Sequence, residues 1–521
     1  MIDSIRIQNF RSFRDTGFIK LNKLNILLGT NSSGKSSFLR SFPLFTQSIK
    51  KNLRGPISWF DYSSVDFGDY ETAKWRYADI SDDIIFSYII KKPFLPSINY
   101  WYYESYASIS TDTVNDVELA LHYRNDVVGT FVNKIVLILN DITYQFSIDE
   151  RGSSVRFNID GKDVNIGKWR WSQSTSNGMM PLWRPVLEKD SSATMEIADY
   201  LYKMAVDALK KHCNKRLKNY SRLNFVISNW TNNHSLFLDT LRLQTQLMSL
   251  SNVAFTWNQD DPEFLLLSDK ISPFYIYQLL RLLNQELSNF YETCRYIAPI
   301  RAEANRFYRS QGLNVNEIDS YGKNLAEFVS SLSDKSKDSY EDFCQRVLGQ
   351  KVMTNSFQGQ SSIMLSSDNI KENLVDVGFG YSQILPIITQ LWLSINYSQY
   401  FKPRGLAYVR KGRANCVLIE QPELHLHPAM QAKIADAFIE FVKWSAEKKS
   451  QFYSLIVESH SQAIINRLGR RIREGEISPD DINVILFEKS RDYKETLIRQ
   501  IGFNRRGQLN DWPYGFFDPL D

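Results

Sequence analysis

The sequence has few cysteines and no long apolar run. Its four cysteines are scattered without a Cys-x-x-Cys pair, which excludes a zinc hook and a dense disulfide framework and favours a reducing compartment. No stretch approaches the roughly 18 apolar residues that suggest a membrane-spanning helix. The first residues, MIDSIRIQNFRSF, carry Arg and Gln where a signal peptide needs an apolar core. We therefore expect a cytoplasmic protein without membrane contact.

The chain also lacks a strong net charge of either sign. The formal net charge is +4 over 521 residues, so no global field favours nucleic acid or membrane as a partner. A local basic segment, 209–223 (LKKHCNKRLKNYSRL), is a candidate nucleic-acid contact, although a solvated helix face is the simpler explanation. The length allows two to four domains, and 43% hydrophobic residues suffice to build their cores.

Hydrophobic patterns divide the chain into three regions. In 1–190, short strand patterns precede a stretch of apolar runs and turn signals between about 80 and 180, which predicts antiparallel strands. Residues 191–295 have the spacing of packed helices and predict a helical insertion. In 296–521, short apolar strands alternate with helices, which predicts a parallel sheet and an α/β fold. The polar segment SSLSDKSKDS, 330–339, predicts a surface loop.

The strongest motif is GTNSSGKSS, Gly29–Ser37. It fits G-x-x-x-x-G-K-[ST], follows a strand pattern and precedes a helix pattern, which is the context that a P-loop requires. Backbone amides of such a loop wrap around phosphate at a helix N-terminus. Lys35 would reach the β- and γ-phosphates, and Ser36 would place its hydroxyl on Mg²⁺. The motif therefore predicts binding of ATP with Mg²⁺.

Three further motifs follow in the second half of the chain. In CVLIEQPELHLHP, 416–428, an apolar strand ends at Glu420, the position from which P-loop enzymes hold Mg²⁺. In VDVGFGYSQ, 375–383, Gly380 and Ser382 open an apolar helix, whose N-terminus is a potential anion site. In LIVESHS, 455–461, a strand delivers His460 into a turn. Alone, the last two are better explained as a glycine turn before a core helix and as a structural histidine.

The order of these motifs after IRIQNFRSF resembles the ABC-type ATPases of the SMC, RecF and overcoming-lysogenisation-defect group. The resemblance implies an ABC-type P-loop ATPase head with an antiparallel β-rich subdomain and a helical insertion. It implies an N-terminal ATPase lobe at 1–190, the insertion at 191–295, and a C-terminal lobe at 296–521 that carries the signature motif, the acidic strand end and a switch histidine.

The resemblance also assigns roles to individual residues. Nucleotide contacts would come from Gly29, Asn31, Ser33, Gly34, Lys35, Ser36, Ser37 and Arg11. The Mg²⁺ ligands would be Ser36 and Glu420. Gly380 and Ser382 would touch a γ-phosphate bound in another protomer, which implies a homodimer or a higher oligomer, and His460 would sense that phosphate. Lys35, Glu420, Gln421, Glu423 and His460 form the expected catalytic set.

Gln421 departs from the family pattern. It stands where many relatives carry a glutamate that acts as general base on water. Glutamine can orient water through hydrogen bonds but cannot take its proton, so we expect slow hydrolysis unless Glu423 substitutes.

Other phrases resemble a narrower group. EQPELHLHPAMQ, YIAPIRAEANRFY and DWPYGFFD are similar to sequences of bacterial antiphage ATPases of the Septu type, including retron-associated forms. This resemblance implies a separate HNH nuclease as partner, together with a reverse transcriptase and its RNA or DNA in the retron case. The alternative is a RecF-like repair ATPase that binds DNA directly.

Overall fold

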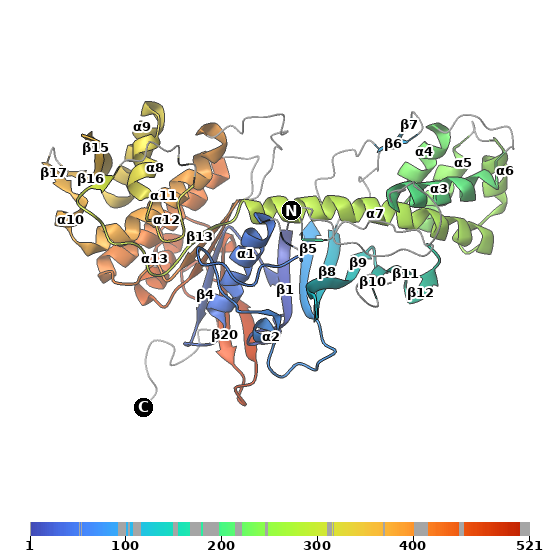
Figure 1. Ribbon diagram of the computed structural model, residues 1–521, viewed down its shortest axis with the longest axis horizontal. Helices are drawn as coiled ribbons and strands as arrows, with labels where there is room; N and C mark the ends of the chain where they lie inside the picture. Colours follow the sequence, from blue (N-terminus) through green and yellow to red (C-terminus); the bar gives the residue numbers. More distant parts are fainter. Residues whose placement is uncertain are drawn as a thin grey trace. The chain divides into compact units, whose positions relative to one another are not determined.

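The computed structural model divides into two compact units (Figure 1). The first comprises Met1–Asn9, Ser48–Ser58 and Asp79–Ser288, and the second comprises Phe10–Gln47, Trp59–Ala78 and Asn289–Asp521. The structure describes residues 2–51, 53, 55–91, 100–102, 105–107, 116–148, 155–166, 179–180, 197–213, 221–244, 248–309, 315, 317–367, 370–400, 415–447 and 453–510.

An antiparallel sheet forms one part of the first unit. Its strands lie in the order β12-β11-β10-β9-β8-β5-β1. The long strand β8 buries every second side chain over most of its length, as expected for a strand with one face on a core. Asn140 and Asp141 join β9 to β10 with φ angles of 49° and 64°, the left-handed conformation that a tight two-residue hairpin turn needs. The strand bounds of this unit are β1 Ile2–Phe10, β5 Ile84–Lys91, β6 Tyr100–Tyr102, β7 Ser105–Ala107, β8 Asp116–Asp126, β9 Gly129–Leu139, β10 Ile142–Ile148, β11 Val155–Ile159 and β12 Lys162–Val164.

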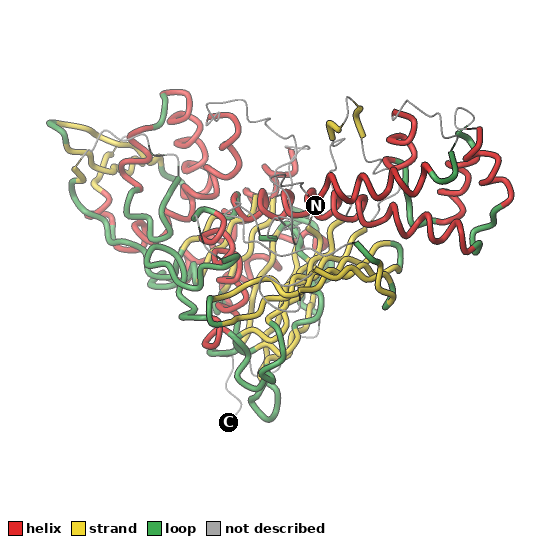
Figure 2. Tube along the Cα trace, turned by 45° about the vertical axis from the view of Figure 1, so that its right-hand side comes forward, coloured by secondary structure: helices red, strands yellow, loops and turns green. Residues whose placement is uncertain are grey.

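Helices form the other part of this unit. They are α3 Ile197–Lys210, α4 Ser221–Ser228, α5 His234–Arg242, α6 Met248–Thr256 and α7 Pro262–Glu292, whose last residues belong to the second unit. The four shorter helices gather around one end of α7 in both views (Figures 1 and 2). The ring of Tyr202 packs edge-on against Phe274, and the indole of Trp230 donates a hydrogen bond to Ser268 at 3.0 Å. These contacts hold the cluster together.

The second unit is built on a six-stranded sheet in the order β13-β18-β19-β4-β20-β21. Five strands are parallel, and only β21 runs antiparallel. All six residues of β4 and of β19 are buried, as expected for parallel strands covered on both faces. The bounds are β4 Leu24–Gly29, β13 Arg295–Ile297, β18 Asn415–Glu420, β19 Tyr453–Glu458, β20 Ile482–Lys489 and β21 Thr496–Ile501. The helices α1 Lys35–Ile49, α11 Phe379–Tyr400, α12 Pro428–Glu447 and α13 Gln462–Arg473 alternate with these strands along the chain.

A smaller antiparallel sheet and short helices complete this unit. The smaller sheet consists of β14 Tyr308–Arg309, β15 Lys351–Phe357, β16 Gln360–Ser367 and β17 Ile370–Asn373. The helices are α2 Tyr70–Ala73, α8 Leu325–Ser331, α9 Asp334–Leu348 and α10 Leu374–Val377, and the short strands β2 Phe13–Asp15 and β3 Ile19–Lys20 lie outside the smaller sheet. The prediction of a surface loop at 330–339 is wrong. Most of this segment is helical because α9 starts at Asp334, just after Ser333, and buries Ser336 and Tyr340 on one face.

The predicted α/β class, with antiparallel strands and a helical region, is confirmed. The short strand patterns near the start of the chain correspond to β1 and β4, and the apolar strands predicted in 296–521 form a parallel sheet. Across the described ranges, no helix has the length and apolar character needed to cross a membrane. The phrase DWPYGFFD, 511–518, lies outside the described residues.

Candidate nucleotide-binding site

The P-loop connects β4 to α1 in the second unit, and two glycines shape it. Gly29 has a φ of 154°, and a Cβ there would lie 2.3 Å from the carbonyl oxygen of Phe487. Gly34 has a φ of 96°, and its Cβ would lie 2.4 Å from the hydroxyl of Ser12. No side chain fits at either position, so both glycines are needed for the loop to turn into the first residues of α1. The positive end of the dipole of α1 then faces the space above the loop.

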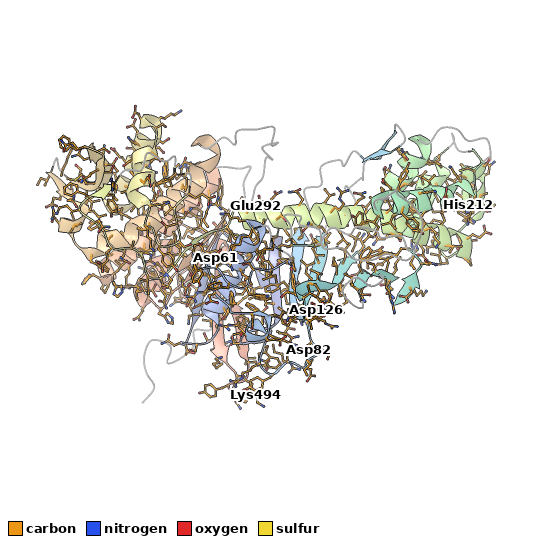
Figure 3. The ribbon with its side chains drawn as sticks, viewed as in Figure 1. Asp61, Asp82, Asp126, His212, Glu292 and Lys494 are labelled. Atoms are coloured by element: carbon orange, nitrogen blue, oxygen red, sulfur yellow. The ribbon has the colours of Figure 1, made fainter. Side chains whose placement is uncertain are left out.

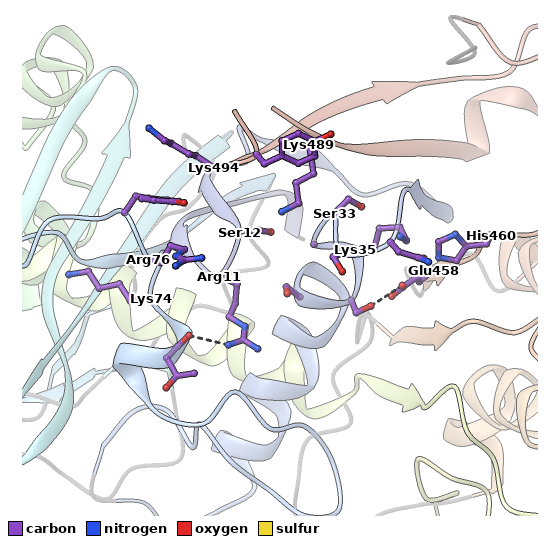
Figure 4. Close-up of a pocket in the computed structure, with 18 of the residues that line it drawn as sticks. Arg11, Ser12, Ser33, Lys35, Lys74, Arg76, Glu458, His460, Lys489 and Lys494 are labelled. Atoms are coloured by element: carbon purple, nitrogen blue, oxygen red, sulfur yellow. Dashed lines mark hydrogen bonds between the residues drawn. The ribbon is translucent and has the colours of Figure 1, made fainter. Parts of the chain in front are cut away.

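A cleft of about 690 Å³ opens over this loop (Figure 4). Nine of the residues singled out in the sequence line it, namely Arg11, Asn31, Ser33, Gly34, Lys35, Ser36, Ser37, Gln421 and His460. Gly29 lies at the end of the strand that carries the loop. The structure thus brings together residues that are more than 400 positions apart in the sequence.

Lys35 and Ser36 have partners within the cleft. The ammonium of Lys35 donates to the carbonyl oxygens of Gly29 and Thr30 at 2.9 and 2.7 Å. Burial lowers the pKa of Lys35, against the opposing charges of two nearby glutamates. The hydroxyl of Ser36 donates to Oε1 of Glu458 at 2.8 Å (Figure 4). Glu458 was not among the residues expected from the sequence.

Glu420 lies at the end of β18, and its carboxylate is fully engaged. Arg40 of α1 donates from Nε to Oε2 at 2.9 Å and from Nη2 to Oε1 at 2.6 Å. The hydroxyl of Tyr296 donates to Oε2 at 2.6 Å. The side chain of Glu420 is 3% exposed and does not line the cleft. The structure therefore places the expected Mg²⁺ acid in an ion pair whose carboxylate is buried and whose guanidinium is partly exposed.

Glu458, one strand closer to the P-loop, lines the cleft instead. In the sheet register it is the neighbour of Glu420 on β18 and of Leu27 on β4. Burial, and next the charge of Glu420, raise the pKa of Glu458 to about 7. The signal in the sequence was the carboxylate at the end of LIVE, two residues before His460.

Gln421 lines the cleft with an unusual backbone. Its φ is 44°, and its N–H donates to the carbonyl oxygen of Glu458 at 2.9 Å. The buried guanidinium of Arg301 holds the same turn, donating from Nη2 to the carbonyl oxygens of Glu420 and Gln421 at 3.0 and 3.1 Å. Burial lowers the pKa of Arg301 to about 10. Arg301 therefore fixes where Gln421 lies.

Glu423 and His460 meet behind this turn. The carboxylate of Glu423 accepts hydrogen bonds from the Ser459 hydroxyl at 2.9 Å and from the His460 N–H at 2.6 Å. Glu423 does not line the cleft, and burial raises its pKa. Burial, together with the charge of Lys35, lowers the pKa of His460 to about 4, so its imidazole is neutral near pH 7.

The residues expected to act on a second protomer lie elsewhere. Gly380 and Ser382 are in the first turn of α11 and do not line the cleft. The Ser382 hydroxyl is mostly buried and donates to the carbonyl oxygen of Phe379 at 2.6 Å.

The rim of the cleft is more basic than the motifs predicted. Lys74, Arg76, Lys489 and Lys494 line it with Arg11, and Glu458 is the one carboxylate among its lining residues (Figure 4). These cations come from separate segments, so a single motif could not show them. A cleft with this balance of charge suits a polyanion such as a nucleoside triphosphate.

The candidate nucleic-acid segment 209–223 lies in the other unit and is described only in part. Lys210 ends α3, and the His212 ring that follows packs edge-on against Trp257 with centroids 5.1 Å apart (Figure 3). Residues 214–220, which carry three of the six cations, lie outside the described residues. The segment remains a prediction.

Comparisons with solved structures identify similar chains. One is the Smc head domain with an extended coiled coil, bound to the C-terminal domain of ScpA and derived from Pyrococcus furiosus; identity is 10%, coverage 96% of both chains, and the TM-score 0.32. Another is the SMC head domain from Thermotoga maritima, with 7% identity, coverage of 96% of this chain and 98% of that chain, and a TM-score of 0.31. No curated protein matches the chain.

The sequence itself matches a family model. The model describes an AAA ATPase domain and aligns with residues 1–465, which include the P-loop, the acidic strand end and His460. Because the match extends over most of the 521 residues, the chain belongs to the AAA ATPase domain family.

Proposed function

We propose that the protein binds ATP in this cleft and acts as a slowly hydrolysing, nucleotide-gated switch in the cytoplasm. The observation that carries the proposal is the convergence of the P-loop, Gln421 and His460 on one basic cleft. The amides at the start of α1 would receive the β-phosphate. Lys35 would leave the loop carbonyls that it contacts now and bind the β- and γ-phosphates.

The residues beside Ser36 suit Mg²⁺. Ser36 offers a hydroxyl oxygen, and Oε2 of the adjacent Glu458 is buried and accepts no hydrogen bond from the described residues. Oxygen ligands of this kind are those that Mg²⁺ takes in proteins. A cation held by Ser36 and Glu458 would stabilise negative charge on the bound phosphates.

We expect slow hydrolysis because neither Gln421 nor Glu423 is placed to act as a general base. Gln421 is a hydrogen-bonding group that orients water but takes no proton. Glu423 has both oxygens engaged by the turn at Ser459 and His460 and lies away from the cleft. The neutral imidazole of His460 would form a hydrogen bond with the γ-phosphate or with a water beside it. Because ADP lacks the γ-phosphate, this hydrogen bond would distinguish ATP from ADP.

The switch would work in antiphage defence as an oligomer. Gly380 and Ser382 open α11, and they would contact the nucleotide of another protomer across a head-to-head interface. The resemblance to Septu-type ATPases supports an HNH nuclease as the controlled partner, with a reverse transcriptase and its RNA or DNA in the retron case. ATP binding would then set the state of the nuclease.

Two measurements test this function. Steady-state turnover of the purified protein should be well below about 10 s⁻¹, the median for enzymes. Co-purification with an HNH nuclease, the proposed partner, should depend on ATP and be lost in Lys35→Ala. Fast turnover would contradict the slow switch. Binding of DNA without any partner, at the same affinity in Lys35→Ala, would contradict the gated role.

A further inference from the structure

We propose that Glu458, at the end of β19, is the carboxylate that faces the divalent cation bound with the nucleotide, and that Glu420 is a structural acid. This inference rests on the proposed ATP function and specifies its metal site. It moves the metal-facing acid one strand toward the P-loop from the position expected from the sequence.

The sheet order favours Glu458 by position. Strand β19 lies directly beside β4, which carries the P-loop, whereas β18 is one strand further away. Glu458 pairs in register with Leu27, two residues before the end of β4, and Glu420 pairs with Glu458. The carboxyl end of β19 is therefore the acidic strand end nearest to the hydroxyl of Ser36, which already contacts it at 2.8 Å.

The contacts of Glu420 disfavour it as a metal ligand. Both of its oxygens accept hydrogen bonds from the guanidinium of Arg40, and one also accepts from Tyr296. An Arg–carboxylate pair with two parallel bonds has strong and specific geometry. To reach a cation beside Ser36, Glu420 would have to break this pair and leave Arg40 without its counter-ion.

Glu458, by contrast, lacks a comparable cation partner. Oε1 accepts from the Ser36 hydroxyl, and Oε2 is buried with no hydrogen bond among the residues described. The ammonium of Lys35 is directed to two loop carbonyls. A buried carboxylate oxygen without a partner is costly, and a divalent cation at Ser36 would satisfy it.

The cation must arrive together with phosphate. Within the described ranges, no group of three or more His, Cys, Asp or Glu side chains is placed to hold a metal by itself. Mg²⁺ typically takes one or two protein ligands and fills its octahedron with waters and substrate phosphates. One hydroxyl and one carboxylate beside a phosphate-binding loop match that requirement. Metal binding should therefore be weak without nucleotide and strong with it.

The test replaces Mg²⁺ with Mn²⁺ and measures free Mn²⁺ by electron paramagnetic resonance, with and without a slowly hydrolysed ATP analogue. Glu458→Gln keeps the shape and removes the charge, and we expect at least about a tenfold loss of Mn²⁺ affinity in the ternary complex. Glu420→Gln should stay within about threefold of the unsubstituted protein. The matched control is Glu488→Gln, an exposed carboxylate that pairs with Arg499 at 2.9 Å.

The outcomes separate this inference from the proposed function. Failure of the unsubstituted protein to bind the analogue would overturn both. Normal Mn²⁺ affinity in Glu458→Gln, or an equal loss in Glu420→Gln, would overturn only the metal assignment. A second measurement, on the unsubstituted protein, locates the metal even if a variant does not fold. With hydrogen peroxide and ascorbate added, Fe²⁺ bound with the analogue should direct oxidative backbone cleavage next to Ser36 and Glu458, and cleavage confined to the Glu420 turn would contradict the assignment.

Discussion

Removal of the Arg40 side chain should destabilise the second unit because it leaves a buried carboxylate without its ion-pair partner. In the structure, the Arg40 guanidinium makes two hydrogen bonds to Glu420, whose side chain is 3% exposed. Arg40→Ala would leave Glu420 with the hydroxyl of Tyr296 as its remaining side-chain donor among the described residues. The buried carboxylate would then lack a hydrogen-bonded cation, since the nearby Arg301 donates to the backbone carbonyl oxygens of Glu420 and Gln421.

The expected cost is about 3 kcal/mol of unfolding free energy. Loss of one partner from a buried ion pair costs about 3–5 kcal/mol, and the lower end applies because the Arg40 side chain is 39% exposed and partly solvated. Glu420→Gln should cost less, about 1–2 kcal/mol, since Arg40 can turn to water and the amide still accepts hydrogen bonds. In the double variant Arg40→Ala with Glu420→Gln, no buried charge is left without its partner. We expect the double variant to lose about 1–2 kcal/mol less than the sum.

Urea unfolding monitored by tryptophan fluorescence measures the change in unfolding free energy for the two single variants and the double variant. An unchanged transition slope m would confirm that the surface exposed on unfolding is the same. Two results would refute the reasoning. One is an Arg40→Ala cost below about 1 kcal/mol, which is typical of a surface pair. The other is strict additivity in the double variant, which would mean that the two side chains do not depend on one another.

Three further predictions concern the cleft and its support. Lys35→Ala should abolish ATP binding in calorimetry, and retained affinity would exclude the P-loop as the phosphate site. Gln421→Glu should raise steady-state turnover at least about tenfold by adding a general base, whereas an unchanged rate would show that this position does not limit hydrolysis. Gly469→Ala should lower the free energy of unfolding by about 1–3 kcal/mol, because its Cβ would lie 2.2 Å from the Gly507 carbonyl oxygen. The control Gly502→Ala should leave the free energy of unfolding unchanged, because no atom lies within 4 Å of the added Cβ.

The sequence was most informative where one local pattern decides the chemistry. The P-loop combines a buried strand, two glycines with required conformations and a helix start within Leu24–Ile49, so strand, turn and lysine could all be predicted. The parallel strands of the last third were also clear, since each is a short apolar run next to a helical pattern.

Long-range pairing could not be predicted in the same way. Whether the acid at the end of β18 faces the cleft depends on Arg40, which lies 380 residues away in sequence and whose role no motif indicates. Glu458 was overlooked because His460, two residues further on, matched a known pattern. The helix α9 was missed because its polar first turn, Asp334 to Lys337, looks like a loop until the buried face that begins with Ser336 and Tyr340 is considered.

Crystals grown with Mn²⁺ and a slowly hydrolysed ATP analogue would show whether this cleft binds ATP with its metal at Ser36. Anomalous scattering locates the Mn²⁺ without reference to the surrounding side chains. We expect triphosphate along Gly34 to Ser37 and one anomalous peak between the Ser36 hydroxyl and the Glu458 carboxylate. Nucleotide bound elsewhere, or a peak coordinated by Glu420 with Arg40 displaced, would contradict it.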